Sequence, residues 1–118
     1  IFLTHAHLDH IAALPLMIDT VGDMRDRPVT VHATEAVLQI LRNHIFNWSV
    51  WPDFTTIPTA DSPVLAFSPL RLGEPCAIGP LTVTAVPAEH TVPAVGYWLD
   101  SGSGSLVFTG DTTVNDVF

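Results

Sequence analysis

The chain has 118 residues, room for one domain, and its 47% hydrophobic and 14% charged residues exclude an intrinsically disordered protein. The chain has no lysine, which excludes a P-loop lysine and a Schiff-base lysine, and its net charge is −8. Both features also argue against a broad nucleic-acid surface, which needs clustered positive charge. Cys76 is the single cysteine, so no disulfide or cysteine metal cluster can form within the chain. The longest apolar stretch, residues 11–18, is too short to span a bilayer.

The ends of the sequence differ from natural chain ends. The chain opens without Met on Ile1-Phe2-Leu3 and stops at Phe118. We therefore expect residues 1–118 to be one partial domain whose N- and C-terminal parts are missing. The sequence does not identify the compartment, and we expect a soluble protein, in the cytoplasm rather than the periplasm.

The first part of the chain predicts strand, loop and helix in turn. Residues 1–4 form an apolar run typical of a short buried strand, and residues 5–10 predict a polar loop. Residues 11–18 have a helical apolar pattern, in which Pro15 is awkward for a regular helix. The polar residues 19–28 then predict an exposed connection.

A second strand and helix follow. Residues 29–32 predict a strand that ends at His32, to which we assign a structural role. Thr34 is the expected N-cap of a helix over residues 35–44. Residues 46–63 predict a long loop rich in aromatic side chains, which either pack against the core or bind a ligand.

From Val64 onward the pattern predicts β-structure. Residues 81–86 alternate between apolar and polar, while residues 95–99 and 105–109 are apolar runs. The Ser-Gly-Ser-Gly sequence of residues 101–104 predicts a hairpin turn between the last two strands.

The main chemical motif is a histidine cluster directly after the first apolar run. His5, His7, Asp9 and His10 stand within six residues. Side chains two apart in an extended segment point to the same side, so His5 and His7 can face one ion. Asp9 and His10 lie where the chain turns into a helix and can reach a second ion. Imidazole and carboxylate are suitable ligands for zinc, iron and manganese.

Two further candidate ligands follow strands. His90 comes after the strand at residues 81–87, and Asp111 comes at the end of the last apolar run. Side chains at strand ends gather at sites in layered α/β folds. Together with the first cluster they make a nearly complete set of metal ligands.

These residues resemble the signature of the metallo-β-lactamase superfamily of binuclear metallohydrolases, whose metal loop reads His-x-His-x-Asp-His. Within it, the chain looks most like the class II 3′,5′-cyclic-nucleotide phosphodiesterases. That similarity rests on four blocks, which are residues 4–10, residues 42–47 followed by 51–54, residues 90–97 and residues 108–112. The resemblance implies an α+β fold, the four-layer αββα sandwich of that superfamily, of which this chain supplies only a part.

The resemblance also implies a ligand set and a reaction. One divalent ion would be held by His5, His7 and His90, the second by Asp9 and His10, with Asp111 bridging. We expect two Zn²⁺ ions, with Mn²⁺ or Fe²⁺ as alternatives. Asp9 and Asp111 are the implied catalytic residues, because a metal-bridging hydroxide would open the cyclic phosphate of cAMP or cGMP to the 5′-monophosphate.

The aromatic loop supplies the candidate substrate contacts. His44 or Asn47 can bond to phosphate or ribose, and a purine can stack on an aromatic ring of the loop, which offers Phe46, Trp48, Trp51 and Phe54. The alternative is that the aromatic side chains of this loop pack in the core or in a subunit contact. The arginines are expected to be solvated. The expected partner is a small cyclic nucleotide, with neither nucleic acid nor membrane, and a homodimer is one option.

Two departures from the class pattern keep other functions open. Residues 12–15 read Ala-Ala-Leu-Pro where the class has a small Gly or Ser followed by aliphatic residues, and no histidine follows His90. The further histidine ligand of the superfamily would thus lie beyond Phe118. The alternatives are a tRNA 3′-end endonuclease, another hydrolase of this fold such as a lactone or thioester hydrolase, and a non-catalytic metal-binding fragment.

Overall fold

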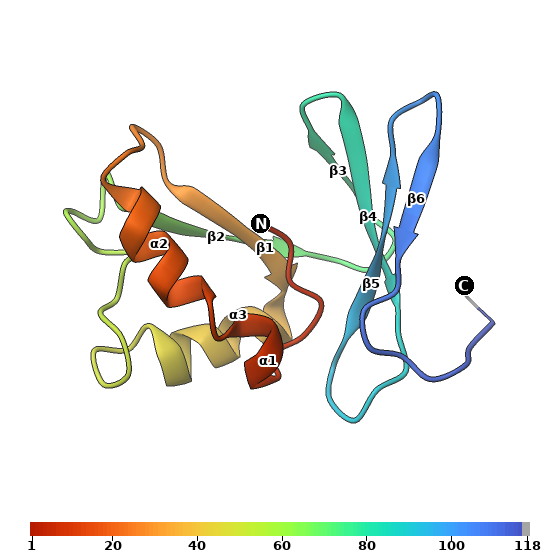
Figure 1. Cartoon of the computed structure of the whole chain (residues 1–118), viewed down its shortest axis with the longest axis horizontal. Coiled ribbons are helices and arrows are strands. Elements are labelled where there is room, and N and C mark those ends of the chain that lie inside the picture. The colour runs from red at the N-terminus through yellow and green to blue at the C-terminus, as the bar shows by residue number, and fades with distance from the viewer. Residues whose placement is uncertain (117–118) are drawn as a thin grey trace. The chain divides into compact units, whose positions relative to one another are not determined.

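A computed structural model describes residues 1–116 of the chain, which divides into two compact units (Figure 1). Unit 1 covers Ile1–Pro69 and unit 2 covers Leu70–Phe118. Each has its own sheet, with two strands in unit 1 and four in unit 2. Within residues 1–116, no helix has both the length and the apolar character needed to cross a membrane.

The N-terminal segment pairs with a strand over a shorter stretch than predicted. Phe2 forms an isolated parallel bridge with His32, and the Leu3 amide donates to the His32 carbonyl at 3.0 Å. The segment is therefore strand-like, but residues 1–4 are not a full strand. The predicted polar loop over residues 5–10 is also too long, because helix α1 (Leu8–Ile11) begins inside it.

The helical pattern at residues 11–18 belongs to two helices. Helix α1 ends at Ile11, and helix α2 runs over Leu14–Gly22. Pro15 stands in the first turn of α2, where a missing amide hydrogen costs no helical hydrogen bond. The proline that is awkward in one long helix thus fits well at the start of a second. Because α2 continues to Gly22, the exposed connection is shorter than predicted.

The next elements are strand β1 (Val29–Thr34), helix α3 (Glu35–Ile40), π-helix η1 (Leu41–Ile45) and strand β2 (Leu65–Leu70). Strands β1 and β2 form the sheet of unit 1. Thr34 is the N-cap of α3, as predicted, although its side chain makes no capping hydrogen bond. His32 lies within β1 and not at its end.

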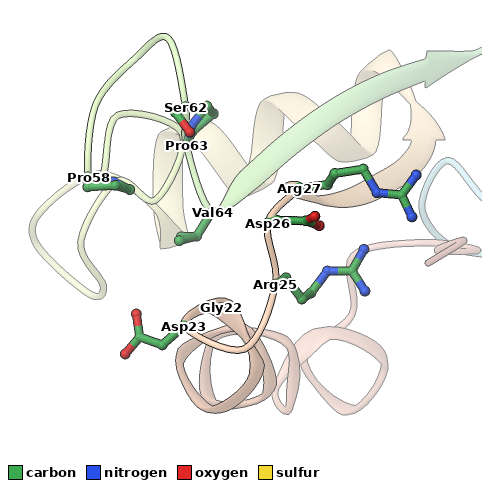
Figure 2. A pocket seen from close by; sticks show the side chains of 9 residues that line it. All are labelled: Gly22, Asp23, Arg25, Asp26, Arg27, Pro58, Ser62, Pro63 and Val64. Carbon is green, nitrogen blue, oxygen red and sulfur yellow. The ribbon is translucent and has the colours of Figure 1, made fainter.

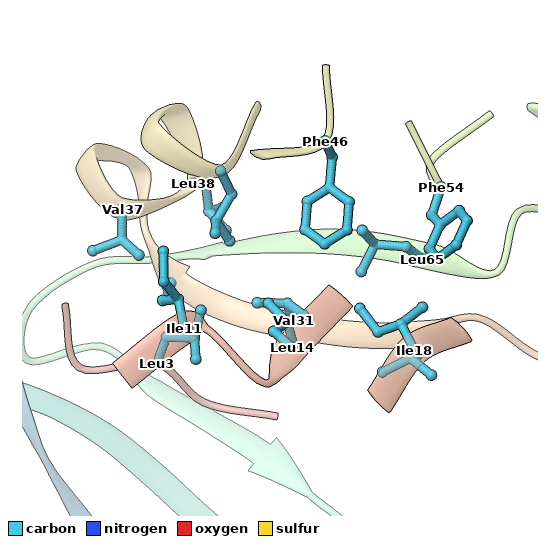
Figure 3. Packing of buried hydrophobic residues seen from close by; sticks show 13 residues of the cluster. Leu3, Ile11, Leu14, Ile18, Val31, Val37, Leu38, Phe46, Phe54 and Leu65 are labelled. Carbon is cyan, nitrogen blue, oxygen red and sulfur yellow. The ribbon is translucent and has the colours of Figure 1, made fainter. Parts of the chain in front are cut away.

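The core of unit 1 lies between its helices and its strands (Figure 3). Ile18 of α2, Val31 of β1, Leu38 of α3 and Leu65 of β2 are all fully buried. Figure 3 shows side chains from α2 and from α3 pointing into the same apolar space. Such packing fixes the helices against the sheet, and so fixes the loop that precedes α1.

Unit 2 is an antiparallel sheet of four strands in the order β3-β4-β5-β6. The strands are β3 (Pro75–Ile78), β4 (Leu81–Pro87), β5 (Val95–Asp100) and β6 (Ser105–Phe108). The predicted hairpin turn between β5 and β6 is present, and Gly102 there has a φ of 84°. Strands β4 and β6 both run antiparallel to β5, so their C-terminal ends lie at the same edge of the sheet.

Candidate metal centre

The histidine loop of unit 1 brings three imidazole rings together. The His5 ring centroid lies 4.8 Å from that of His7 and 4.2 Å from that of His10. A ring nitrogen of His5 is within 4.8 Å of one in each of these neighbours. His5 is fully buried, whereas His7 and His10 are half-buried. This gives a dense group of nitrogen donors that opens towards solvent on one side.

A hydroxyl group orients the buried ring. The Thr4 hydroxyl lies 2.9 Å from His5 Nδ1. A hydrogen bond at one ring nitrogen selects the other for a metal, so His5 would bind through Nε2. Thr4 is not among the predicted site residues, although a hydroxyl residue directly before a candidate ligand histidine is a signal that could have identified it.

The beginning of α1 supplies a carboxylate beside the imidazoles. Asp9 is in the first turn of α1, and its Oδ2 lies 3.5 Å from His10 Nε2. The Asp9 side chain is 79% exposed and that of His10 is 29% exposed. The first turn of α1 thus places Asp9 beside His10, and these are the two residues that the sequence predicts as ligands of one ion.

Unit 2 carries a second pair of candidate ligands. His90 follows β4 and Asp111 follows β6, at the edge where these two strands end. His90 Nε2 lies 3.8 Å from Asp111 Oδ2. The strand order therefore brings together two side chains that are 21 residues apart in the sequence.

Both pairs have a separation suited to shared coordination of an ion. Zinc binds histidine nitrogen and carboxylate oxygen at about 2.0–2.2 Å, so two such ligands of one ion are at most about 4.4 Å apart. The Asp9–His10 distance of 3.5 Å and the His90–Asp111 distance of 3.8 Å satisfy that limit. Imidazole and carboxylate also suit manganese and iron. The residues of each unit therefore fit a divalent metal ion.

The predicted substrate residues lie elsewhere in unit 1. Helix α3 and its continuation η1 lead away from α1, and the aromatic loop follows η1 (Figure 1). His44 is exposed, and Asn47 is used within the loop. The Asn47 Nδ2 donates to the Asn43 carbonyl at 2.7 Å, and its Oδ1 accepts from the Ser49 amide at 2.9 Å. Asn47 is thus held by hydrogen bonds within its own loop.

The aromatic side chains of this loop have different environments. Phe46 and Phe54 are 3% and 8% exposed and belong to the core, as the core-packing alternative predicts. Trp51 packs against that core and meets Phe54 edge to face. Its buried Nε1 has no hydrogen-bond partner among the described residues. Trp48 is 66% exposed and has a φ of 70°, so the loop presents one aromatic ring to solvent.

The pocket in Figure 2 is separate from the predicted site. It has a volume of about 260 Å³, and none of the predicted site residues is among the described residues that line it.

The arginines differ in their exposure. Arg25 and Arg27 line this pocket and are exposed, as predicted, and their side chains project to the same side. Arg42 is partly solvated, with a side chain that is 39% exposed, and it also has neighbours in unit 1. Its guanidinium lies 2.8 Å from Glu35 Oε1 and 5.2 Å from the Phe67 ring centroid.

His32 is a buried histidine outside the metal loop. Its ring stacks on Phe2 with a centroid distance of 4.5 Å, and its Nδ1 has no hydrogen-bond partner among the described residues. Burial lowers the pKa of His32 below its ordinary value of 6.5, because a buried site disfavours the charged form of the ring. The folded chain therefore favours neutral His32.

This lowered pKa predicts an acid-sensitive stability. The unfolded state binds a proton near pH 6.5 and the folded state only at lower pH, so stability falls as the pH drops from 6.5 towards the folded pKa. His32→Phe keeps the ring stacked on Phe2 and removes the titration. Urea unfolding between pH 7.5 and pH 5 is expected to show a smaller loss of stability for the variant. Equal losses in both proteins would contradict the prediction.

The family of the chain is decided by comparison with known proteins. A sequence model described as "Beta-lactamase superfamily domain" matches residues 1–116. The chain belongs to this superfamily. A solved structure of unliganded yeast PDE1 superimposes on 95% of the chain and 34% of its own length, with a TM-score of 0.79 and 26% identity. The metallo-β-lactamase fold implied by the sequence is thereby confirmed.

The sequence of the chain is also similar to those of individual proteins. A probable 3′,5′-cyclic-nucleotide phosphodiesterase from Yersinia pestis is 31% identical over 98% of the chain and 34% of its own length. A nuclear ribonuclease Z from Triticum aestivum is also 31% identical, over 82% of the chain and 52% of its own length. The predicted similarity to cyclic-nucleotide phosphodiesterases is confirmed. The chain spans about a third of the length of the phosphodiesterase relative.

Proposed function

We propose that the chain is part of a metal-dependent phosphodiesterase that opens the 3′,5′-cyclic phosphate of cAMP or cGMP to the 5′-monophosphate. The observation that carries this proposal is the arrangement of donor pairs in each unit, with Asp9 beside His10 and His90 beside Asp111. The similarity to the Yersinia phosphodiesterase over 98% of the chain supports the substrate class. Because the chain spans a third of that relative, we propose that residues 1–118 are one part of a larger domain.

The ligand assignment that we propose uses both units. His5, His7 and His90 would hold one ion, Asp9 and His10 the second, and Asp111 would bridge the two. The separations within each pair support it, as does the Thr4 hydroxyl that leaves His5 Nε2 for a metal. Two bound Zn²⁺ ions would lower the pKa of water and offset charge on the phosphoryl oxygens.

The charges of the chain suit an anionic substrate at this centre. Two divalent ions bring four positive charges, from which Asp9, Asp111 and a bridging hydroxide would remove three. The remaining ligands are neutral imidazoles, so the loaded centre is locally cationic inside a chain of net charge −8. The two carboxylates thus bind the ions without cancelling their attraction for phosphate.

Substrate recognition by the aromatic loop is a separate part of the proposal. Trp51 retains one supporting feature, an indole N–H that is buried without a partner among the described residues and could donate to a ligand. His44 and Asn47 have weaker support, because Asn47 is bonded within its own loop. We therefore place base recognition on Trp51 before the other two.

A panel of substrates tests the proposal. The complete protein, loaded with zinc, is compared on cAMP, cGMP and bis-p-nitrophenyl phosphate. We expect turnover of a cyclic nucleotide that exceeds that of the generic ester. Turnover of the generic ester alone would keep a phosphodiesterase and reject the cyclic substrate. A metal-loaded protein that cleaves none of them would overturn the proposal and favour the carboxylic-ester or non-catalytic alternatives.

A tRNA 3′-end endonuclease is the second candidate function. It is favoured by the 31% identity to the wheat ribonuclease Z, which equals that to the Yersinia protein. The charge of the chain weighs against it, because four arginines and no lysine offer little positive surface for RNA. Cleavage of a precursor tRNA in preference to a cyclic nucleotide would select this function.

A further inference from the structure

A set of hydrogen bonds ties together the two loops of unit 2 that carry the candidate ligands. The Glu89 amide donates to the Thr112 hydroxyl oxygen at 2.9 Å, and the Thr113 amide donates to the Glu89 carbonyl at 2.8 Å. The Thr113 hydroxyl also lies 3.4 Å from Glu89 Oε2. We call these three contacts the Glu89 bracket.

The bracket stands directly beside both ligands. Glu89 precedes His90 and Thr112 follows Asp111, so the bracket connects the two residues whose donor atoms are 3.8 Å apart. It lies outside the sheet, because β4 ends at Pro87 and β6 ends at Phe108. The hydrogen bonds between paired strands therefore end before these loops, and the Glu89 bracket connects the loops instead.

The Thr112 hydroxyl is the centre of the local network. Besides the Glu89 amide it accepts a hydrogen bond from Asn115 Nδ2 at 3.1 Å, and it donates to the Thr113 carbonyl at 2.9 Å. A hydroxyl can accept two hydrogen bonds and donate one, so this group is fully used. A side chain of the same shape without oxygen would break all three contacts.

We propose that Thr112 is a positioning residue, which holds His90 and Asp111 at a separation suited to one metal ion. The inference rests on the proposed function, because it requires these two residues to be ligands. Some groups do not bind the metal themselves but orient the residues that do. Removal of such a group commonly weakens metal affinity about 10–100-fold. Thr112→Val keeps the β-branched shape and removes the acceptor of the Glu89 amide.

The test measures metal binding by the complete protein directly. Co²⁺ affinity is followed by the d–d absorption of the bound ion, for wild type, Thr112→Val, Thr112→Ser and His90→Ala. Thr20→Val is the matched control, because it removes an exposed threonine hydroxyl outside the bracket, one that donates to the Leu16 carbonyl at 2.9 Å. Thr112→Ala is the second variant if Thr112→Val does not fold.

We expect Thr112→Val to weaken Co²⁺ binding about 10–100-fold and to alter its spectrum, while Thr112→Ser and Thr20→Val remain near wild type. The Glu89 amide hydrogen is expected to exchange faster in Thr112→Val alone. Near-wild-type affinity in both Thr112→Val and Thr112→Ala, with binding lost in His90→Ala, would overturn this inference and leave the proposed function intact. Unchanged binding in His90→Ala would overturn the proposed metal centre, and the inference with it.

Discussion

Asp111→Ala is expected to reduce cyclic-nucleotide hydrolysis by the complete protein about 10³-fold. Asp111 Oδ2 lies 3.8 Å from His90 Nε2, and the proposed assignment makes this carboxylate a ligand of both ions. Its removal would weaken both metal sites at once. The measurement is kcat/KM for cAMP and cGMP at saturating zinc, together with the bound zinc of the same samples.

Asp19→Ala is the matched control for this variant. Asp19 is an exposed carboxylate on α2 and belongs to none of the donor pairs described above. Its removal changes the net charge by the same amount, so an effect of charge alone would appear in both variants. Loss of less than about tenfold in Asp111→Ala, or equal loss in both variants, would contradict the assignment of Asp111 as a bridging ligand.

Leu38→Ala is expected to lower the free energy of unfolding by about 3 kcal/mol, within the range for leucine deletions in a packed core. Leu38 of α3 is fully buried in the core of unit 1, where α2, α3 and the sheet meet. The variant removes apolar contact and leaves a cavity. Urea unfolding of the complete protein at equal metal content measures the loss.

Leu16→Ala is the corresponding surface control. Leu16 is on α2, like the core residue Ile18, but is 60% exposed. We expect its truncation to change stability by no more than about 0.5 kcal/mol. Equal destabilisation by the two leucine variants would mean that Leu38 is not in a tightly packed core, or that another surface covers Leu16.

The sequence predicted best where one local rule decides the structure. The alternating pattern at residues 81–86 has period two, and β4 covers it. The Ser-Gly-Ser-Gly turn also appeared where predicted, because its residues match the backbone that a hairpin needs. The spacing of the histidine loop predicted that its side chains lie close together, and the rings of His5, His7 and His10 do gather over six residues of chain.

Errors arose where distant residues decide the outcome. The predicted helix over residues 35–44 changes to a π-helix at Leu41, whose carbonyl accepts from the Phe46 amide at 2.9 Å. Both Leu41 and Phe46 are buried, so packing selects this geometry, and local propensity does not distinguish it from an α-helix. Arg42 likewise finds its aromatic neighbour Phe67 on another element.

The metal content of the complete protein tests the central claim most directly. The protein is loaded with zinc, dialysed and analysed for metal per chain, beside His7→Ala and His10→Ala, which remove one proposed ligand from each site. A binuclear centre predicts two zinc ions per chain for wild type and fewer for each variant. Equal zinc in all three proteins, or none in the folded wild type, would contradict a binuclear centre built on this histidine loop.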